Sequence, residues 1–157
     1  MSMISTGDSA PDFTLPATQG GEFTLSKQDG VGTVLFFYPK DNTPGCTKEA
    51  IGFTAHLAEF EKLGISVVGM SPDSLKKHEN FAAKQNLEVN LISDEALSIL
   101  QAYGVWTEKK MYGKSYMGVE RTTLLIDAKG KVFHAWHKVK VPGHVEEVLE
   151  KAREMAA

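Results

Sequence analysis

The chain has 157 residues, and its composition of 42% hydrophobic and 24% charged residues is typical of a soluble globular protein. At this length we expect a single domain, spanning residues 1–157, that buries a sizeable core without covalent cross-links. The formal net charge of -3 gives no broad basic surface for nucleic acid or anionic membranes, so neither partner is expected.

The single cysteine, Cys46, excludes an intrachain disulfide and suits a reducing compartment. Residues 1–8 lack the basic and apolar regions of a signal peptide. No apolar run approaches the roughly 18 residues that span a bilayer. We therefore expect a cytoplasmic protein.

Two short segments near the N-terminus alternate apolar and polar residues. They cover residues 10–16 and 22–25, with Gly20 and Gly21 between them, which predicts a β-hairpin at the edge of a sheet. The next strand, expected over residues 33–38, lacks this alternation, as in strands that are buried on both faces.

A helix is predicted to start soon after this strand. Pro39 ends the strand, Thr43 is a favourable N-cap, and Pro44 is a favourable first helical residue. Cys46 then lies in the first turn, where backbone N–H groups lack intrahelical partners and the helix dipole favours the thiolate over the thiol. The arrangement indicates a thiol active site, while the alternative for a lone cysteine is a small buried hydrophobe.

Cys46 also begins the buried stripe of the predicted helix, which is expected to end near Gly64. The stripe consists of Cys46, Ala50, Phe53, Leu57 and Phe60. The thiol is therefore expected in a shallow, partly desolvated pocket. Because burial disfavours a charge, a stable thiolate there needs a nearby cation in addition to the helix end.

The second half of the chain continues to alternate strands and helices. Residues 104–118 are predicted to be a long loop, which either walls a pocket or is a surface excursion pinned by Trp106. The order of elements predicts an α/β fold in which a central mixed sheet lies between helices. The expected strands are 65–70, 89–92, 119–126 and 132–136, and the expected helices are 74–85, 93–103 and a last one after His144.

The segment around Cys46 resembles the active-site signature of the peroxiredoxins, Pro-x-x-x-Thr-x-x-Cys. Its Thr-Pro-Gly-Cys-Thr form is similar to the bacterioferritin-comigratory, or Q-type, subfamily. The resemblance implies a thioredoxin-like fold and a thiol peroxidase that reduces hydrogen peroxide and organic hydroperoxides to water and alcohols, without a cofactor. Further segments agree in the same order along the chain, namely 10–13, 69–74, 110–114, 121–123 and 136–140.

The resemblance also implies a role for each residue of the site. Cys46 would be the peroxidatic cysteine that becomes a sulfenic acid, Thr43 would orient the peroxide, and Pro39 would shield the pocket from water. Arg121 would hold a cation beside the thiolate. Attack on an O–O bond needs donors where charge develops, and the N–H groups of Gly45 and Cys46 are suitable. Without the resemblance, Thr43 reads as a plain N-cap and Arg121 as a surface charge.

The chain departs from the Q-type pattern at the resolving cysteine. Most members carry it five residues after the peroxidatic cysteine or in the next helix, where this chain has Ile51 and Ala82. The protein is therefore either a one-cysteine peroxidase, recycled by thioredoxin or another thiol reductant, or a protein whose resolving cysteine has been replaced. A monomer is preferred over a homodimer.

Other chemistries have less support in the sequence. A Cys–His hydrolase needs a base near the thiol, and His56 lies too far along the predicted helix. His134 and His137 point to opposite faces of a predicted strand, so no metal site is expected. The remaining alternative is a non-catalytic redox sensor of thioredoxin fold, in which oxidation of Cys46 changes partner binding.

Overall fold

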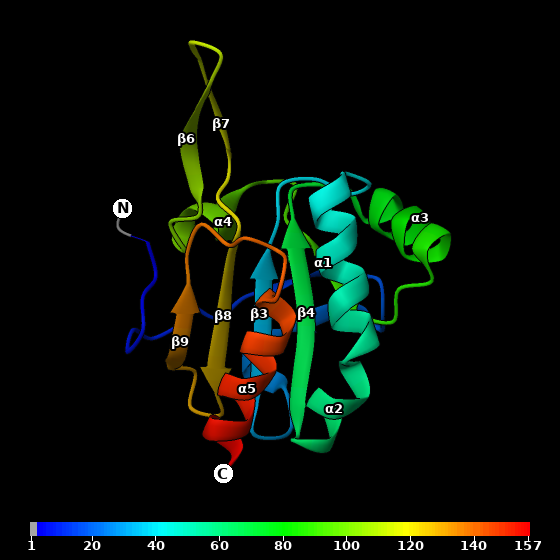
Figure 1. Cartoon of the computed structure of the whole chain (residues 1–157), viewed down its shortest axis with the longest axis vertical. Coiled ribbons are helices and arrows are strands. Elements are labelled where there is room, and N and C mark those ends of the chain that lie inside the picture. The colour runs from blue at the N-terminus through cyan, green and yellow to red at the C-terminus, as the bar shows by residue number, and fades with distance from the viewer. Residues whose placement is uncertain (1–2) are drawn as a thin grey trace.

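A mixed β-sheet with helices against both of its faces forms the body of the protein (Figure 1). The structure is a computed structural model that describes residues 3–157. Its strands are β1 (Thr14–Ala17), β2 (Gly21–Thr24), β3 (Gly32–Phe37), β4 (Ile65–Ser71), β5 (Asn90–Ser93), β6 (Trp106–Met111), β7 (Lys114–Val119), β8 (Thr122–Asp127) and β9 (Val132–Trp136). Its helices are α1 (Pro44–Ala55), α2 (Leu57–Lys62), α3 (Leu75–Gln85), α4 (Ser98–Ala102) and α5 (His144–Ala156), with a 3-10 turn η1 (Leu25–Lys27).

The large sheet has the strand order β2-β1-β5-β4-β3-β8-β9 and combines parallel and antiparallel pairing. β3 is parallel to β4, and β4 is parallel to β5, whereas β8 and β9 are antiparallel to their neighbours. β1 and β2 form an antiparallel hairpin that joins the sheet through β5. The predicted mixed sheet and N-terminal hairpin are therefore confirmed.

The central strand β3 contributes to a hydrophobic core on each side of the sheet. Val34 and Phe36 belong to the cluster that includes residues of α1, α2 and α5. Leu35 and Phe37 belong to the opposite cluster, which includes residues of α4 and the N-terminal segment. Because successive side chains of a strand alternate in direction, one apolar run supplies both layers. The end of β3 is thereby fixed immediately before the loop that leads to Cys46.

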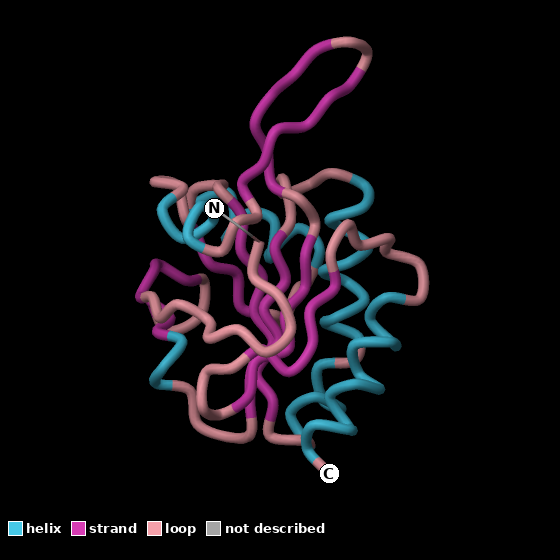
Figure 2. The backbone as a smooth tube through the Cα atoms, turned by 90° about the vertical axis from the view of Figure 1, so that its left-hand side faces the viewer, coloured by secondary structure: helices cyan, strands magenta, loops and turns pink. Residues whose placement is uncertain are grey.

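Residues 104–118 contain a hairpin, so the prediction of one long loop is wrong. β6 and β7 pair with each other outside the large sheet and project from the body (Figures 1 and 2). Tyr112 and Gly113 make the turn at positive φ, and Tyr112 is 96% exposed. Most of the hairpin meets solvent, so its sequence lacks the apolar–polar alternation that identifies a half-buried strand.

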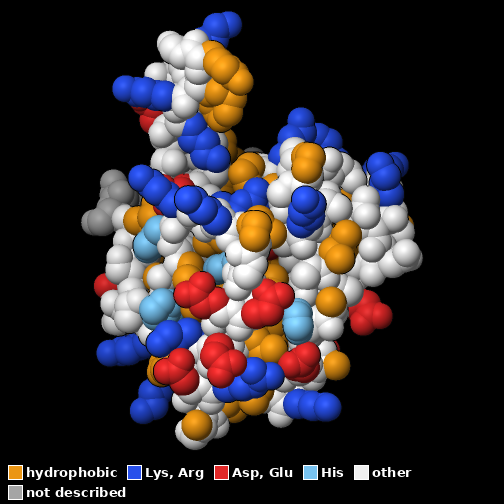
Figure 3. All heavy atoms as spheres, viewed as in Figure 1, with side chains coloured by type: hydrophobic (Ala, Val, Ile, Leu, Met, Phe, Trp, Pro, Cys, Tyr) orange, Lys and Arg blue, Asp and Glu red, His pale blue; other side chains and the backbone are white. Residues whose placement is uncertain are grey.

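The surface of this hairpin combines apolar and basic side chains, as Figure 3 shows. Acidic side chains gather lower on the body in the same view, among other lysines and arginines. The exposed apolar residues are Met111, Tyr112, Tyr116 and Met117, and the lysines are Lys109, Lys110 and Lys114.

The helix predicted to end near Gly64 is divided into α1 and α2. His56 leaves helical geometry between them, with φ -102° and ψ 5°, and its Nδ1 lies 3.1 Å from Glu59 Oε1. Phe53 and Phe60 are both fully buried across the break, with ring centroids 6.1 Å apart. The predicted buried stripe is therefore kept although the helix is interrupted.

The helix expected over residues 93–103 is shorter than predicted, because Leu97 adopts a positive φ of 64° and α4 begins only after it. Asp94 caps α4 by accepting hydrogen bonds from two backbone N–H groups through Oδ2. Within residues 3–157, no helix combines the length and the apolar character needed to cross a membrane.

Candidate active site

The loop after β3 places Cys46 in the first turn of α1, as the sequence predicted. Residues 38–43 connect the strand to the helix. The N–H group of Thr47 donates to the carbonyl oxygen of Thr43 at 2.9 Å and begins the helical ladder. The N–H groups of Gly45 and Cys46 precede this bond and are directed beyond the helix end. The first turn can therefore donate to an anion or a polar substrate atom.

Arg121 brings a positive charge to the sulfur of Cys46. It lies between β7 and β8, and its Nη2 donates to Cys46 Sγ at 3.1 Å. Its Nη1 donates to Glu49 Oε1 at 2.7 Å. Cys46 is 1% exposed and Glu49 is fully buried. The buried sulfur thus lies at one end of a row of groups that continues through the partly buried guanidinium to a buried carboxylate.

Burial and ion pairing act in opposite directions on the two charged groups. Burial raises the pKa of Glu49 to about 7, although the charge of Arg121 opposes this shift. Burial alone would lower the pKa of Arg121, but Glu49 and Cys46 outweigh it, so its pKa lies above its ordinary value. Arg121 therefore stays charged, whereas Glu49 changes its charge near neutral pH.

Gly45 leaves room for the guanidinium to approach the thiol. A Cβ atom at this position would lie 3.3 Å from Arg121 Nη2, which is closer than an ordinary contact. Any larger residue would press on the group that donates to Cys46. The glycine of the Thr-Pro-Gly-Cys segment therefore has a steric role in addition to its backbone N–H.

Pro39 and Thr43 both lie in the loop before α1 and are half-buried. Thr43 occupies the N-cap position, but its hydroxyl donates to the carbonyl oxygen of Lys40 at 2.8 Å and does not cap α1. The prediction that this side chain caps the helix is therefore wrong, because the hydroxyl turns back toward the loop. Its oxygen can still accept a hydrogen bond from a bound molecule.

Sequence reasoning missed Glu49 and Lys109 as members of the site. The signal for Glu49 was a carboxylate on the buried face of the helix, three residues after Cys46. Lys109 comes from β6, and burial followed by the charge of Arg121 lowers its pKa, while Cys46 acts in the opposite direction. Lys109 had no detectable signal, because the hairpin that carries it was predicted to be a loop.

Glu49→Gln is expected to flatten the pH dependence of stability between about pH 4.5 and pH 7. The pKa of Glu49 is 4.5 for the unperturbed group and about 7 in the folded protein, where burial raises it. The folded protein keeps a proton that the unfolded chain releases. This contribution to the free energy of unfolding is on the order of 3 kcal/mol. It is complete below about pH 4.5 and is lost as the pH rises through 7.

Urea unfolding at about pH 5 and about pH 8 measures this effect as a difference in the free energy of unfolding. Glu79→Gln, at an exposed position of α3, is the matched control and should keep the pH dependence of the wild type. The same pH dependence in Glu49→Gln and the wild type would contradict the assignment.

Neither position expected for a resolving cysteine carries sulfur. Ile51 lies on α1 and is 43% exposed. Ala82 lies on α3, where it packs partly buried against the core cluster that also contains Cys46. Cys46 is the single cysteine of the chain, so no thiol of the same chain can form a disulfide with it.

Similarity to known proteins agrees with this arrangement. The model of the AhpC/TSA family matches residues 6–135. Peroxiredoxin Bcp of Bacillus subtilis is 44% identical over 153 residues, with 98% of each chain covered. Peroxiredoxin Bcp of Escherichia coli K12 is 39% identical over 156 residues, with 99% of this chain and 100% of the relative covered.

Solved structures share the fold. The bacterioferritin comigratory protein of Xanthomonas campestris, studied for its alkyl peroxide reduction activity, has a TM-score of 0.87 and 43% identity, with 92% of each chain covered. A cysteine-to-serine variant of PrxQ from Xylella fastidiosa has a TM-score of 0.92 and 39% identity over the full length of both chains.

A sheet of this order, with a thiol at the helix that follows its central strand, defines a thiol-based redox protein of thioredoxin-like fold. The chain belongs to the AhpC/TSA family and is a peroxiredoxin of the Bcp, or Q, type.

Proposed function

We propose that the protein is a thiol peroxidase that reduces hydrogen peroxide and organic hydroperoxides to water and alcohols at Cys46. The main support is the 3.1 Å hydrogen bond from the Arg121 guanidinium to Cys46 Sγ, made inside the protein at the first turn of α1. A cation and free N–H groups at one sulfur favour the thiolate, which is the nucleophile that the reaction needs.

The proposed reaction transfers one oxygen atom and two electrons. The thiolate of Cys46 attacks the terminal oxygen of the peroxide, an S–O bond forms and the O–O bond breaks. The sulfur is oxidised to a sulfenic acid, and the leaving oxygen takes a proton and departs as water or an alcohol. One external thiol then attacks the sulfenic sulfur, releasing water and forming a mixed disulfide. A second external thiol attacks the outer sulfur of that disulfide, forms a disulfide with the first external thiol, and releases the Cys46 thiolate.

Each remaining site residue has a proposed part in this attack. Arg121 and the N–H groups of Gly45 and Cys46 donate to the peroxide oxygens where negative charge develops. Thr43 accepts a hydrogen bond from the peroxide O–H, because its own proton is bonded to Lys40. Pro39 follows β3 and limits the access of bulk water to the sulfur.

Peroxide consumption in the presence of thioredoxin, thioredoxin reductase and NADPH tests the function. Sustained NADPH oxidation that depends on peroxide supports a peroxidase. If Cys46 is instead oxidised once and no thiol system gives turnover, the non-catalytic redox sensor is the correct reading. Glutathione and dithiothreitol in parallel reactions distinguish a protein reductant from a small thiol.

Thr43→Val is expected to slow the reaction of Cys46 with hydrogen peroxide by about 10- to 100-fold, because a positioning contact is lost. Thr43→Ser keeps the hydroxyl and should stay close to the wild type. The rate is measured in a single turnover by quenching at set times and determining the intact mass. A wild-type rate in Thr43→Val would defeat the proposed role.

Excess hydrogen peroxide is expected to convert Cys46 to sulfinic acid, because the chain has no second thiol to trap the sulfenic acid. Intact mass spectrometry after graded peroxide should show two added oxygen atoms in the absence of reductant. Addition of an external thiol during the exposure should suppress the second oxygen. A mass that never exceeds one added oxygen at high peroxide would contradict this expectation.

We also propose that the protein acts in the cytoplasm and as a monomer. The single cysteine supports a reducing compartment. The site supports the monomer, because the groups proposed to bind peroxide all come from one chain. Light scattering of the reduced protein at working concentration measures the state of association, and a stable dimer would overturn the second part.

A further inference from the structure

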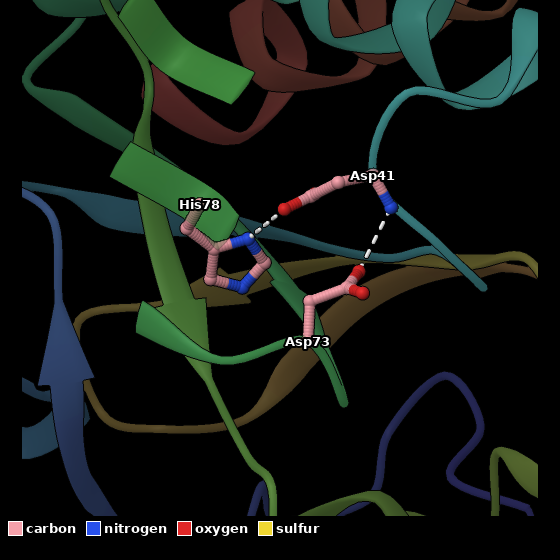
Figure 4. A group of neighbouring side chains, drawn as sticks. All are labelled: Asp41, Asp73 and His78. Carbon is pink, nitrogen blue, oxygen red and sulfur yellow. Dashed lines mark hydrogen bonds and ion pairs between the residues drawn. The ribbon is translucent and has the colours of Figure 1, made fainter. Parts of the chain in front are cut away.

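A buried histidine–aspartate pair lies beneath the loop that precedes the active-site helix. His78 Nδ1 on α3 lies 2.7 Å from Asp41 Oδ2 in the loop (Figure 4). The side chains of His78 and Asp41 are 0% and 2% exposed. Nothing in the sequence indicated that His78 and Asp41 would be partners. Neither residue has a part in the reaction described so far.

The partners of this pair fix the positions of its protons. His78 Nε2 lies 2.9 Å from the carbonyl oxygen of Ile92, which can only accept, so Nε2 carries a proton. Tyr38 donates its hydroxyl proton to Asp41 Oδ1 at 2.6 Å. Burial, followed by the charge of Asp41, raises the pKa of Tyr38 well above its ordinary value, so this donor keeps its proton. One further proton lies between His78 Nδ1 and Asp41 Oδ2.

Asp41 is also held through its backbone. Its N–H group donates to Asp73 Oδ2 at 2.8 Å, as Figure 4 shows, and Ser71 donates to the same oxygen at 2.8 Å. Asp41 is the one residue of the loop 39–43 that is buried. Asp41 therefore anchors the loop both to α3 and to the segment between β4 and α3.

Asp41 lies inside a short hydrogen-bonded ring that also contains Thr43, whose hydroxyl is proposed to bind the peroxide. The bond from Thr43 Oγ1 to Lys40 O closes this ring around Asp41 and Asn42. Asn42 has a φ of 64°, a left-handed conformation that asparagine adopts more readily than most other non-glycine residues and that makes a tight turn here. Asp41 is held through both its side chain and its backbone, so the start of this turn is fixed and the direction of the Thr43 hydroxyl is restricted.

We propose that Asp41 and His78 are positioning residues for peroxide reduction, whose buried hydrogen bond holds the loop 39–43 so that Thr43 is directed at the substrate of Cys46. The proposal rests on the peroxidase function proposed above. Neither residue touches the peroxide, and both act through Thr43. The thiolate itself depends on Arg121 and the end of α1, so the pair affects the orientation of the substrate and not the reactivity of the sulfur.

Two substitutions of His78 separate its two hydrogen bonds. In His78→Gln the amide can replace Nε2 and keep the bond to Ile92, but the bond to Asp41 is lost. In His78→Asn the shorter amide replaces Nδ1 and can donate to Asp41. His78→Gln and Asp41→Ala are expected to slow single-turnover oxidation of Cys46 by hydrogen peroxide about 10- to 100-fold, and His78→Asn is expected to recover most of the rate.

Alkylation of Cys46 by iodoacetamide gives the second readout, because it follows the thiolate and does not use Thr43. Its rate should change less than about twofold in all three variants. Leu149→Ala, a buried change in α5 outside the loop, is the control for general loss of stability and should leave both rates unchanged when measured well below its melting temperature. The double variant Thr43→Val with His78→Gln should react no more slowly than Thr43→Val alone, because both changes remove the same contact.

Three results would overturn the proposal: a wild-type peroxide rate in His78→Gln and Asp41→Ala, equal losses in the peroxide and alkylation rates, or additive losses in the double variant. The first would show that the pair only stabilises the fold, and the other two that it acts on the sulfur or independently of Thr43. If the wild-type protein itself does not react with peroxide, the proposed function fails, which is a separate outcome.

Discussion

Cys46→Ser is expected to reduce peroxide consumption to the background of the reductant alone. A serine hydroxyl does not ionise near neutral pH. Its oxygen also cannot be oxidised by the peroxide, so no intermediate corresponding to the sulfenic acid can form. Arg121 and the N–H groups of the first turn remain in place, so peroxide can still bind but no O–O bond is broken. NADPH oxidation with the thioredoxin system measures the loss in steady state.

The same variant provides a stoichiometric test. After treatment with peroxide, its intact mass should be unchanged, whereas the wild type should gain oxygen at one site. Unfolding in urea checks that the serine, which is smaller and buried at the same position, has not disrupted α1. Residual turnover in a folded Cys46→Ser protein would place the chemistry at another residue and reject the proposed reaction.

The thiol and its helix could be predicted from the sequence because their signals are local. An apolar run ended by Pro39, followed by Thr43 and Pro44, predicts a strand, a loop and a helix start, and Cys46 falls in the first turn. The partnership with Arg121 could not be derived in this way. The two residues are 75 positions apart in the chain. Only the resemblance to the peroxiredoxins predicted that Arg121 would lie beside Cys46.

Contacts that depend on tertiary packing were not predictable. Glu49 is paired on the buried face of α1 with Arg121, which reaches it from the segment between β7 and β8, and buried Asp41 is paired with His78 of α3. Both are charged groups whose burial is stable only with a partner that the local sequence does not reveal. The β6–β7 hairpin was missed because it is mostly exposed and not because of a buried partner. A strand exposed on both faces lacks the apolar–polar alternation by which a strand is recognised.

Arg121→Ala is expected to slow the attack of Cys46 on hydrogen peroxide by about 10²- to 10³-fold, the loss typical of removing one preorganised donor. The guanidinium both stabilises the thiolate and donates to the developing charge, so two contributions disappear together. Glu49 is affected as well. Burial already raises its pKa to about 7, and without Arg121 nothing opposes that shift, so the carboxyl takes up a proton near neutral pH.

The two contributions are separated by the pH profile of iodoacetamide alkylation and the single-turnover rate with peroxide. In Arg121→Ala the alkylation profile should move to higher pH, and the peroxide rate should remain depressed even where Cys46 is fully ionised. Arg121→Lys keeps the charge but not the two-pronged geometry that reaches Glu49 and Cys46 together, so it should recover the alkylation profile more than the peroxide rate.

Arg153→Ala removes an exposed arginine that pairs with Glu59 and Glu150 and is the control for loss of a positive charge. An unchanged alkylation profile in Arg121→Ala would show that the 3.1 Å contact does not stabilise the thiolate, and the cation role would have to be abandoned.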